Sequence, residues 1–353
     1  MKKKIIYLSL VFLLFLSHDL FSQDLKNSEQ VIKGSRLFLN QELLPIKLEY
    51  SNKHIKKNTN DSTYITSDLS YKLKDGSWDR LKVKIRARGN NRLKNCYFAP
   101  LKVKIKKSVA AGTLFEGNKK LKLVLPCLRQ KDNNDNIVKE YMAYKLYELI
   151  SPYHYKTRLT EIDLTEITGS KTKNHTLIGI LIEDIDNVAK RHNGNVVERN
   201  LHPLVMDDLR AIQNDFFQFM IGNTDFSVAF QHNQKLLFID KKLIPVPFDF
   251  DMSGLVHANY ANVSEFKDQS LQITDVTQRL FRGFKRDEKI YHSVRKQFQD
   301  TKIAMFKIID GLELYFDDPN EFLKARNYIL SFYDIIENNQ KFKSEIIQKA
   351  RTK

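Results

Sequence analysis

Three short polar segments lie in the middle of the chain: GNTDFS at residues 222–227, HN at residues 232–233 and PFDFD at residues 247–251. Together they supply carboxylate and side-chain amide oxygens. Such oxygens are the ligands of Mg²⁺, which usually takes one or two carboxylates together with phosphate and water. Asn and Asp are also common at helix ends and in turns for structural reasons. The segments alone therefore leave a metal site and a purely structural role both open.

A predicted hairpin connects the second and third of these segments. Residues 235–239 and 242–247 predict two strands with a turn at residues 240–241, and the apolar run at residues 216–221 predicts a helix before the first segment. If the hairpin folds back, side chains from all three segments meet near one point. These side chains are Asp225, Asn233, Asp249 and Asp251.

The length and composition of the chain bound its fold and its partners. With 353 residues, 42% hydrophobic content and 23 Phe, the chain has enough core for one large or two ordinary domains. Its formal net charge of +16 favours partners that carry phosphate or other anionic groups. A solvated basic surface is the more common explanation of such a charge. We expect no specific nucleic-acid partner.

The N-terminus has the pattern of a secretory signal peptide. Residues 2–4 are all Lys, residues 5–16 are apolar, and Ser22 is a small residue for cleavage before Gln23. The apolar run is too short for a comfortable membrane span. We therefore predict a signal peptide over residues 1–22, export to the periplasm or the extracellular space, and no transmembrane segment.

The chain contains two cysteines, Cys96 and Cys127, and both flank strand-like segments. An even number of cysteines in an exported chain favours a disulfide. Two buried thiols are the alternative. Neither cysteine belongs to a Cys/His cluster with the spacing of a zinc site.

The N-terminal half contains strand patterns with one apolar and one basic face. In KVKIRAR at residues 82–88, three apolar residues alternate with four basic ones, and LKVKIK at residues 101–106 and KLKL at residues 120–123 repeat the alternation. These segments predict an antiparallel sheet in which like charges are neighbours, which is mildly destabilising. A bound anion would offset the repulsion. Lysines fanned out into water are the alternative.

The turn after the first of these strands is a candidate phosphate site. Its sequence is RGNNR at residues 88–92, in which Gly89 and Asn90 tolerate the positive φ angles that aim backbone N–H groups at an anion. Arg88 and Arg92 lie on either side of these residues. A plain β-turn explains the same residues equally well.

The order of the predicted elements divides the mature chain into two lobes. Residues 23–190 are mostly β, with one helix at about residues 137–149, and residues 191–353 are mostly α and carry the acidic segments. In the second lobe we expect helices at about residues 206–221, 274–287, 288–309 and 318–346. The chain is thus predicted to be α+β, with a β-rich N-terminal lobe and an α-rich C-terminal lobe as in atypical protein-kinase-like folds. In such folds a lysine of the first lobe holds phosphates, and acidic and amide side chains of the second hold Mg²⁺.

These motifs together resemble the spore-coat protein H (CotH) kinase family, atypical kinases distantly similar to HipA-type kinases. The resemblance spans about half the chain. It is carried by RGN at residues 88–90, PLKVK at 100–104, KKLKL at 119–123, GILIE at 179–183, GNTD at 222–225, HN at 232–233 and PFDFD at 247–251.

The resemblance implies a role for each candidate residue. Asp225 resembles the catalytic Asp, Asn233 the metal-binding Asn and Asp249 the metal-binding Asp, with Asp251 as a second candidate. Lys102 or Lys104 resembles the phosphate-binding Lys, and Arg88, Gly89 and Asn90 form the turn beside it. Glu140 resembles the partner of that lysine, although in its first helical turn it could simply complement the helix dipole. Glu183 begins the segment between the lobes.

The function implied is that of an exported kinase that transfers phosphate from ATP to a protein, glycan or small-molecule acceptor with Mg²⁺ or Mn²⁺. Two features depart from the kinase pattern. No full glycine-rich loop is present, and Asn233 follows Asp225 by eight residues, more than in typical kinases. Two alternatives therefore remain: a non-catalytic binding or surface-assembly module that uses the same site, and a polyanion binder driven by net charge.

Overall fold

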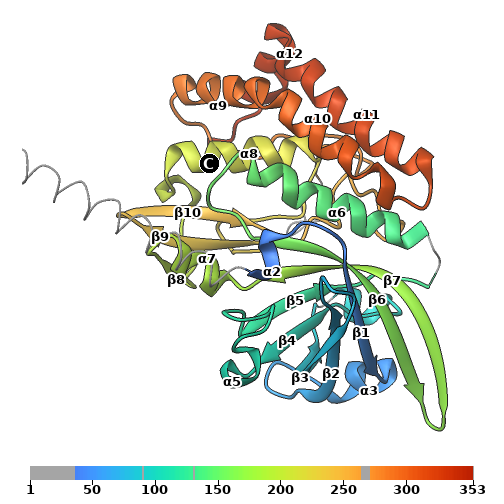
Figure 1. Cartoon of the computed structure of the whole chain (residues 1–353). Coiled ribbons are helices and arrows are strands. Elements are labelled where there is room, and N and C mark those ends of the chain that lie inside the picture. Colours follow the sequence, from blue (N-terminus) through green and yellow to red (C-terminus); the bar gives the residue numbers. More distant parts are fainter. Residues whose placement is uncertain (1–35, 90, 130–131, 264–270, 353) are drawn as a thin grey trace, which may run out of the picture.

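The structure is a computed structural model that describes residues 36–89, 91–129, 132–263 and 271–352. The larger helices gather on one side of the strands (Figure 1). The predicted signal peptide at residues 1–22 lies outside the described residues. Among the helices in the described ranges, none is long and apolar enough to cross a membrane.

Seven strands of the N-terminal half form a closed barrel. They are β1 (Leu44–Tyr50), β2 (Ile65–Lys72), β3 (Trp78–Ala87), β4 (Leu101–Ile105), β5 (Lys120–Val124), β6 (Thr157–Thr168) and β7 (Lys171–Glu183). Their order around the barrel is β1-β2-β3-β4-β5-β7-β6. The barrel closes because β1 pairs in parallel with β6, whereas the other neighbouring strands are antiparallel.

The barrel corrects the fold that the sequence predicts. The α+β class is right, but the kinase-like N-terminal lobe is wrong, because the sheet closes on itself through the β1–β6 pair. That pair places Ile46 opposite Ile162, two residues far apart in the sequence. The alternation of apolar and polar residues within a strand shows which side chains face the core. It does not show which other strand is the pairing partner.

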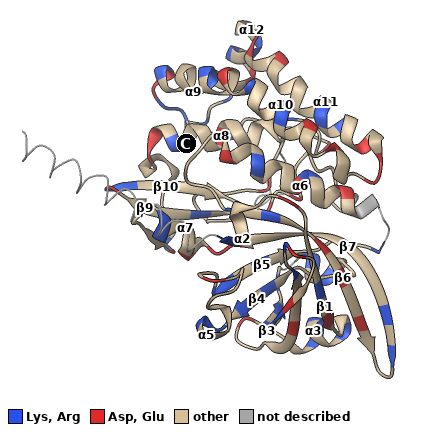
Figure 2. Ribbon diagram, in the orientation of Figure 1, with Lys and Arg blue, Asp and Glu red and all other residues tan. Residues whose placement is uncertain are grey.

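Alternating residues give the barrel wall two different faces. The apolar side chains of β3, β4 and β5 are buried inside the barrel, and the lysines between them point outward. Cross-strand pairing sets Arg86, Lys102 and Lys122 in one row, and Lys84, Lys104 and Lys120 in the next. Figure 2 marks Lys and Arg positions on the barrel strands in blue. The predicted antiparallel sheet with an apolar and a basic face is therefore confirmed for these three strands.

A second sheet carries the acidic segments. Its strands are β8 (Asn195–Val197), β9 (Gln234–Ile239) and β10 (Lys242–Pro247), in the order β10-β9-β8. β9 and β10 form the predicted hairpin, whose turn residues Asp240 and Lys241 have φ angles of +47° and +62°. Two positive φ angles are typical of a type I′ hairpin turn. Pro245 is tolerated within β10 because this strand lies at the edge of its sheet.

Short helices accompany the barrel strands, and longer helices build the C-terminal half (Figure 1). Their bounds are α2 (Arg36–Leu39), α3 (Asn52–Asn58), α4 (Asn91–Asn95), α5 (Lys107–Ala110), α6 (Asp132–Glu148), α7 (Ile185–Arg191), α8 (Asp208–Met220), α9 (Glu288–Asp300), α10 (Lys302–Gly311), α11 (Pro319–Ile336) and α12 (Asn339–Phe342). A π-helical turn, η3 (Lys343–Ile347), continues α12.

Helix α6 follows the barrel strand β5 in sequence but belongs to the core of the helical half. Rings of α6 pack on that half: Tyr144 lies 4.7 Å from Phe250, and Tyr147 lies 4.7 Å from Phe217. Side chains on most sides of α6 are buried, as expected of a helix enclosed by other elements. The helix therefore joins the barrel to the C-terminal helices (Figure 1).

The expected helix at residues 274–287 is wrong, because the described part of this segment is an irregular connection. Arg279 donates to the carbonyls of Met220 and Tyr328, and Arg282 donates to carbonyls of the loop after α8. The segment's cations thus satisfy backbone oxygens at the ends of other elements. The expected helix at residues 288–309 is two helices that meet at Thr301.

Cys96 and Cys127 form a disulfide with their Cα atoms 4.6 Å apart. This bond joins the end of α4 to the segment that follows β5. It therefore ties the turn that carries Arg88 and Arg92 to the strand that carries Lys122.

Candidate functional site

The end of helix α8 positions the first acidic segment. Gly222, with φ +62°, takes the left-handed conformation that commonly ends a helix. A methyl group here would also overlap the hydroxyl of Tyr328. Both the backbone and the packing therefore require glycine. Beyond Gly222 the chain leaves the helix axis and places Asp225 in a loop.

Asp225 is the centre of a hydrogen-bonded group. Its N–H donates to Oδ1 of Asn223 at 3.0 Å, and Nδ2 of Asn223 donates to Oε1 of Gln218 on α8 at 2.8 Å. Its carboxylate accepts from Nδ2 of Asn233 at 2.9 Å and lies 2.9 Å from Nε2 of His232. The hydrogen bond to Asp225 raises the pKa of His232. Asp225 is thus oriented by its own loop and by the start of the hairpin.

The hairpin brings the second acidic segment beside this group, as the sequence predicts. Asn233 and Asp249 stand at its two ends with φ angles of +50° and +64°, a left-handed conformation that Asn and Asp tolerate better than most residues. The N–H of Phe248 donates to the carbonyl of Asn233 at 3.0 Å. The N–H of Asp249 donates to the hydroxyl of Tyr144 on α6 at 2.9 Å. Uncommon backbone angles held by such contacts cluster at functional sites.

Two arginines that follow β3 face the acid pair. Nη2 of Arg88 lies 3.7 Å from Oδ2 of Asp249, and Nε of Arg92 lies 3.9 Å from Oδ2 of Asp251. These distances are too long for hydrogen bonds, so the charges attract without being locked together. Asp251 also accepts a hydrogen bond from Tyr260 at 3.1 Å. The acids of the hairpin and the cations of the barrel therefore meet here.

Buried carboxylates concentrate at this meeting point. Burial, followed by the charges of Asp251 and Asp249, raises the pKa of Glu140 well above its usual value. Burial, followed by the charge of Asp249, raises the pKa of Asp251 to about 6. Neither carboxylate oxygen of Glu140 has a hydrogen-bond partner among the described residues. Carboxylates that repel one another in this way favour a cation between them.

Two lysines of the first basic row border the group. Nζ of Lys102 lies 3.8 Å from Oδ2 of Asp184, the N-cap of α7. Its cross-strand neighbour Lys122 lies over the ring of Phe248 at 3.6 Å. Burial, followed by the charge of Arg88, lowers the pKa of Lys122 to about 7. A phosphate beside Lys122 would favour its charged form, so the row suits an anion.

Two other predicted residues, Lys104 and Glu183, have different surroundings. Lys104 points to the ring of Tyr64, with Nζ 4.1 Å from the ring centre, and belongs to the second basic row. Glu183 is buried in an ion pair with a side chain of α7 at 2.7 Å, which indicates a structural role. Gly89 has the positive φ angle, +83°, that the turn prediction requires. Asn90 lies outside the described residues.

The lysine–glutamate pair implied by the resemblance is not found. No ion pair joins Lys102 to Glu140 in the described part of the chain, where Lys102 is paired with Asp184. The charges that act on Glu140 are those of Asp251, Asp249 and the two arginines. Glu140 therefore neighbours the arginine turn and not the sheet lysine.

Sequence reasoning missed two contributors to the site. Arg282 donates to the carbonyls of Thr224 and Phe226, on either side of Asp225. No local pattern could reveal this, because Arg282 comes from a distant connection. Lys122 could have been found from the sequence, because it occupies the same position in the alternation of β5 that Lys102 occupies in that of β4.

The oxygen donors suit a hard cation that has few protein ligands. In residues 36–352, outside the undescribed gaps, no three His, Cys, Asp or Glu side chains are grouped so that they could hold a metal ion. Asn233, Asp249 and Asp251 offer an amide and two carboxylates. Mg²⁺ sites of this kind are completed by substrate phosphate and water. The residues therefore fit Mg²⁺ bound together with a nucleotide better than a closed protein site.

Comparison with known proteins gives no assignment, since no protein-family model and no curated protein matches the chain. The resemblance to the spore-coat protein H kinases has no support from these comparisons.

Proposed function

We propose that this protein transfers a phosphoryl group from a nucleotide to a hydroxyl-bearing acceptor with Mg²⁺. One observation carries the proposal: oxygen ligands of the hairpin and cations of the barrel converge from distant parts of the chain. The oxygen ligands are Asn233, Asp249 and Asp251, and the cations are Arg88, Arg92, Lys102 and Lys122. The proposal rests on this convergence and not on a kinase-like fold.

Asp225 would act on the acceptor. Its carboxylate is only partly exposed and is held by Asn233 and His232, so it is oriented before the acceptor arrives. A carboxylate within hydrogen-bond reach of a hydroxyl can orient it and accept its proton. His232, bonded to the same carboxylate, stabilises the charge of Asp225.

The barrel side would hold the phosphates. Phosphoryl transfer needs position and neutralised charge more than covalent help. Mg²⁺, when bound, supplies part of that neutralisation. Arg88 and Lys102 add fixed positive charge, and Lys122 gains full charge beside a phosphate. The left-handed backbone at Asn233 and Asp249 holds their oxygen atoms in place without further reorganisation.

Calorimetric titration of ATP with and without Mg²⁺ tests the metal and nucleotide part. We expect the wild type to bind ATP at least tenfold more tightly with Mg²⁺, and Asp249→Ala to lose most of that difference. Asp300→Ala, which removes a carboxylate from a distant surface ion pair, is the matched control. ATP binding that is independent of Mg²⁺ and indifferent to Asp249→Ala contradicts the proposal.

Transfer itself requires a second measurement, the release or transfer of the labelled γ-phosphate over time. Mg²⁺-dependent binding without any turnover, in the presence of varied hydroxyl acceptors, would favour the alternative of a binding or assembly module. The two measurements thus separate nucleotide recognition from catalysis.

A further inference from the structure

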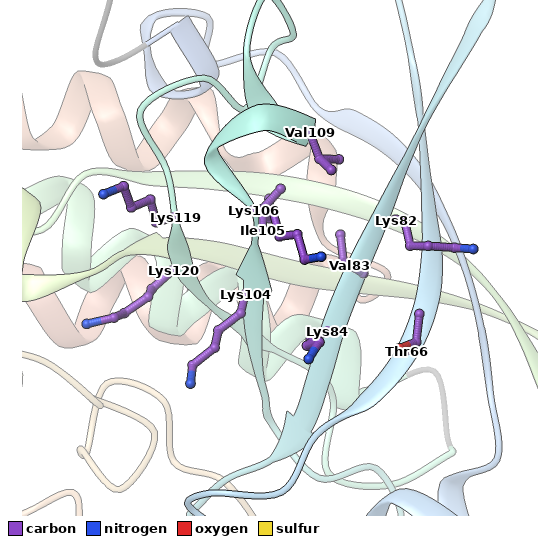
Figure 3. A pocket seen from close by; sticks show the side chains of 10 residues that line it. All are labelled: Thr66, Lys82, Val83, Lys84, Lys104, Ile105, Lys106, Val109, Lys119 and Lys120. Carbon is purple, nitrogen blue, oxygen red and sulfur yellow. The ribbon is translucent and has the colours of Figure 1, made fainter.

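The second basic row borders a cavity that the proposed active site does not use. The cavity has a volume of about 450 Å³ and lies on the outer face of the barrel, between β3, β4 and the turn that carries α5. Figure 3 shows the side chains around it. Six lysines line it: Lys82, Lys84, Lys104, Lys106, Lys119 and Lys120. A volume of this size is in the range of small-molecule sites.

The charges of this cavity are poorly compensated. Lys120 pairs with Asp186 at 2.9 Å, and Lys82 stands opposite Asp68, whose carboxylate is engaged by Arg80 at 2.6 Å. The other four lysines have no ion pair within 4.0 Å in the described part of the chain, and no described carboxylate lines the cavity. Like charges placed directly opposite one another on a sheet are destabilising. An anionic ligand would remove this repulsion.

The spacing of the lysines indicates how closely the negative charges of a matching ligand must be spaced. Strands lie about 4.8 Å apart, so the row of Lys84, Lys104 and Lys120 spans about 10 Å. Lys106, the residue after the end of β4, stands about 7 Å beyond Lys104. An extended acidic peptide presents one side chain to a given face about every 7 Å, which puts about two carboxylates over the row. Phosphate groups carry between one and two charges each at neutral pH, so three linked phosphates supply about four. A compact oligophosphate therefore matches the lysines better.

The remaining lining residues indicate whether the cavity could also recognise a nucleobase. They are Thr66, Val83, Ile105 and Val109, of which Val83 and Ile105 have side chains buried in the barrel core. No aromatic ring among the described lining residues therefore offers a stacking surface for a base. Lysines act as point charges and do not select one phosphate geometry as the arginine fork does. Recognition here would depend on the number of linked phosphates and not on a nucleobase.

We propose that this lysine-lined cavity is a second anion site that binds the oligophosphate part of a small ligand, separate from the site of Asp225 and Asp249. The proposal goes beyond phosphoryl transfer, because it needs neither Mg²⁺ nor a reaction. It accounts for the lining lysines that have no ion pair in the described part of the chain, beside the row that borders the proposed active site.

Calorimetric titration of the mature chain with inorganic tripolyphosphate, without Mg²⁺, tests the proposal. We expect Lys84→Gln/Lys106→Gln to raise Kd at least tenfold. The control Lys289→Gln/Lys307→Gln, which removes the same charge from exposed helix positions, should change Kd less than twofold. Equal weakening by both pairs would assign binding to net charge and overturn the proposal.

Two further arms separate this cavity from other binding modes. Lys122→Gln, at the proposed active site, should leave the Kd for tripolyphosphate within twofold. If Lys122→Gln weakens tripolyphosphate binding and Lys84→Gln/Lys106→Gln does not, the anion binds in the proposed active site, and the proposal is overturned. Orthophosphate, a hexaglutamate peptide and oligodeoxythymidylate should each bind at least tenfold more weakly. Equal affinity for any of them would overturn selection of an oligophosphate.

A measurement on the wild type covers the case of a variant that does not fold. Amine-reactive labelling followed by mass spectrometry should show Lys84, Lys104 and Lys106 protected by tripolyphosphate, while Lys289 and Lys307 label equally with and without it. Unchanged labelling of the three cavity lysines at saturating tripolyphosphate would contradict the proposal.

Discussion

Asp225 owes its orientation to neighbours that are distant in sequence. Asn223 holds its backbone, Asn233 and His232 hold its carboxylate, and Arg282 donates to the carbonyls on either side of it. The local sequence provides the turn residues, whereas the hairpin and the connection after residue 271 provide the remaining contacts. A carboxylate fixed in this way loses little freedom when it meets an acceptor.

Asp225→Asn should remove phosphoryl transfer while the protein stays folded. The amide cannot accept the acceptor's proton, and general-base contributions are typically on the order of 10²- to 10⁴-fold. Initial rates with labelled ATP, together with the midpoint of urea unfolding, measure both effects. Asp240→Asn is the matched control, because residue 240 lies in the exposed turn at the far end of the same hairpin. Undiminished transfer by Asp225→Asn would exclude Asp225 as the base.

Asp215, a buried acidic residue of helix α8, predicts how the free energy of unfolding depends on pH. Burial raises the pKa of Asp215 to about 7, although the charges of Arg351 and Arg282 act in the opposite direction. The unfolded value is about 3.9, so the native protein keeps a proton that the unfolded chain releases. The stability that this proton contributes is fully present below about pH 4 and is lost as the pH rises through 7.

Between pH 5 and pH 8.5 the free energy of unfolding of the wild type should therefore fall by on the order of 3 kcal/mol through this deprotonation. Asp215→Asn should not show this fall. Urea unfolding of the wild type and the variant across this range measures it. The stability of the variant relative to the wild type should increase with pH. The exposed control Asp300→Asn should show no such trend. A constant difference between Asp215→Asn and the wild type would contradict the raised pKa.

At the scale of elements, the ends of helices and strands position the site. Helix α8 ends at a glycine that must be left-handed, β10 ends at a left-handed aspartate, and the turn after β3 carries the facing arginines. Gly222, Asp249 and Arg88 each lie one or two residues beyond a regular element, whereas Arg92 lies in the short helix α4. Regular elements thus determine where the short segments that follow them place their side chains.

Gly222→Ala should destabilise the protein by about 1–3 kcal/mol, because it adds backbone strain and an overlap with the Tyr328 hydroxyl. Gly76→Ala is the matched control, since Gly76 also has a positive φ angle, +87°, but has open space around it. Adding Tyr328→Phe should restore part of the loss only in the Gly222 variant. Thermal and urea unfolding measure these differences. Equal costs at the two glycines would show that packing against Tyr328 contributes nothing.

The disulfide is the second test at this scale. Replacing Cys96 and Cys127 by Ala should cost on the order of 3 kcal/mol, because the bond closes a loop with a sequence separation of 31 residues. Reductant should shift the unfolding midpoint of the wild type by a similar amount and leave the double variant unchanged. A wild type that is indifferent to reductant would argue against a stabilising disulfide.

At the scale of the whole molecule, helix α6 makes the two halves depend on each other. It lies between β5 and β6 in the chain, yet its rings pack on Phe217 and Phe250. Lys139 of α6, which is buried, pairs with Glu321 of α11 at 2.8 Å. The barrel and the helical half therefore share one interface in which the proposed active site also lies.

Residues 23–190 expressed alone should not form a well-packed monomer, because α6 would expose the aromatic face that the helical half covers. Dye binding to exposed apolar surface and gel filtration measure this. Co-expression with residues 191–353 should restore a complex with native-like unfolding. A fragment of residues 23–190 that is monomeric, cooperative and free of dye binding would show that the barrel is independent.

Prediction from sequence succeeded where the information is local. The alternation at residues 82–88 and 101–106 depends on a period of two, and the hairpin depends on its turn, so both could be read directly. The helix expected at residues 274–287 failed because its arginines bind carbonyls of other elements. Lys104 was a candidate equal to Lys102, because the contacts that distinguish them, Lys102 with Asp184 and Lys104 with the ring of Tyr64, join residues far apart in the sequence.

The sequence by itself determined the α+β class, the basic outer face of the sheet and the convergence of the two acidic segments on a hairpin, because each follows from short-range periodicity or turn chemistry. Only the tertiary structure decided that the sheet is a closed barrel, that Arg88 and Arg92 face Asp249 and Asp251, and that a second row of lysines borders its own cavity. These features depend on pairing between residues far apart in the chain. Such pairing is selected by how the whole core packs, and no local pattern encodes it.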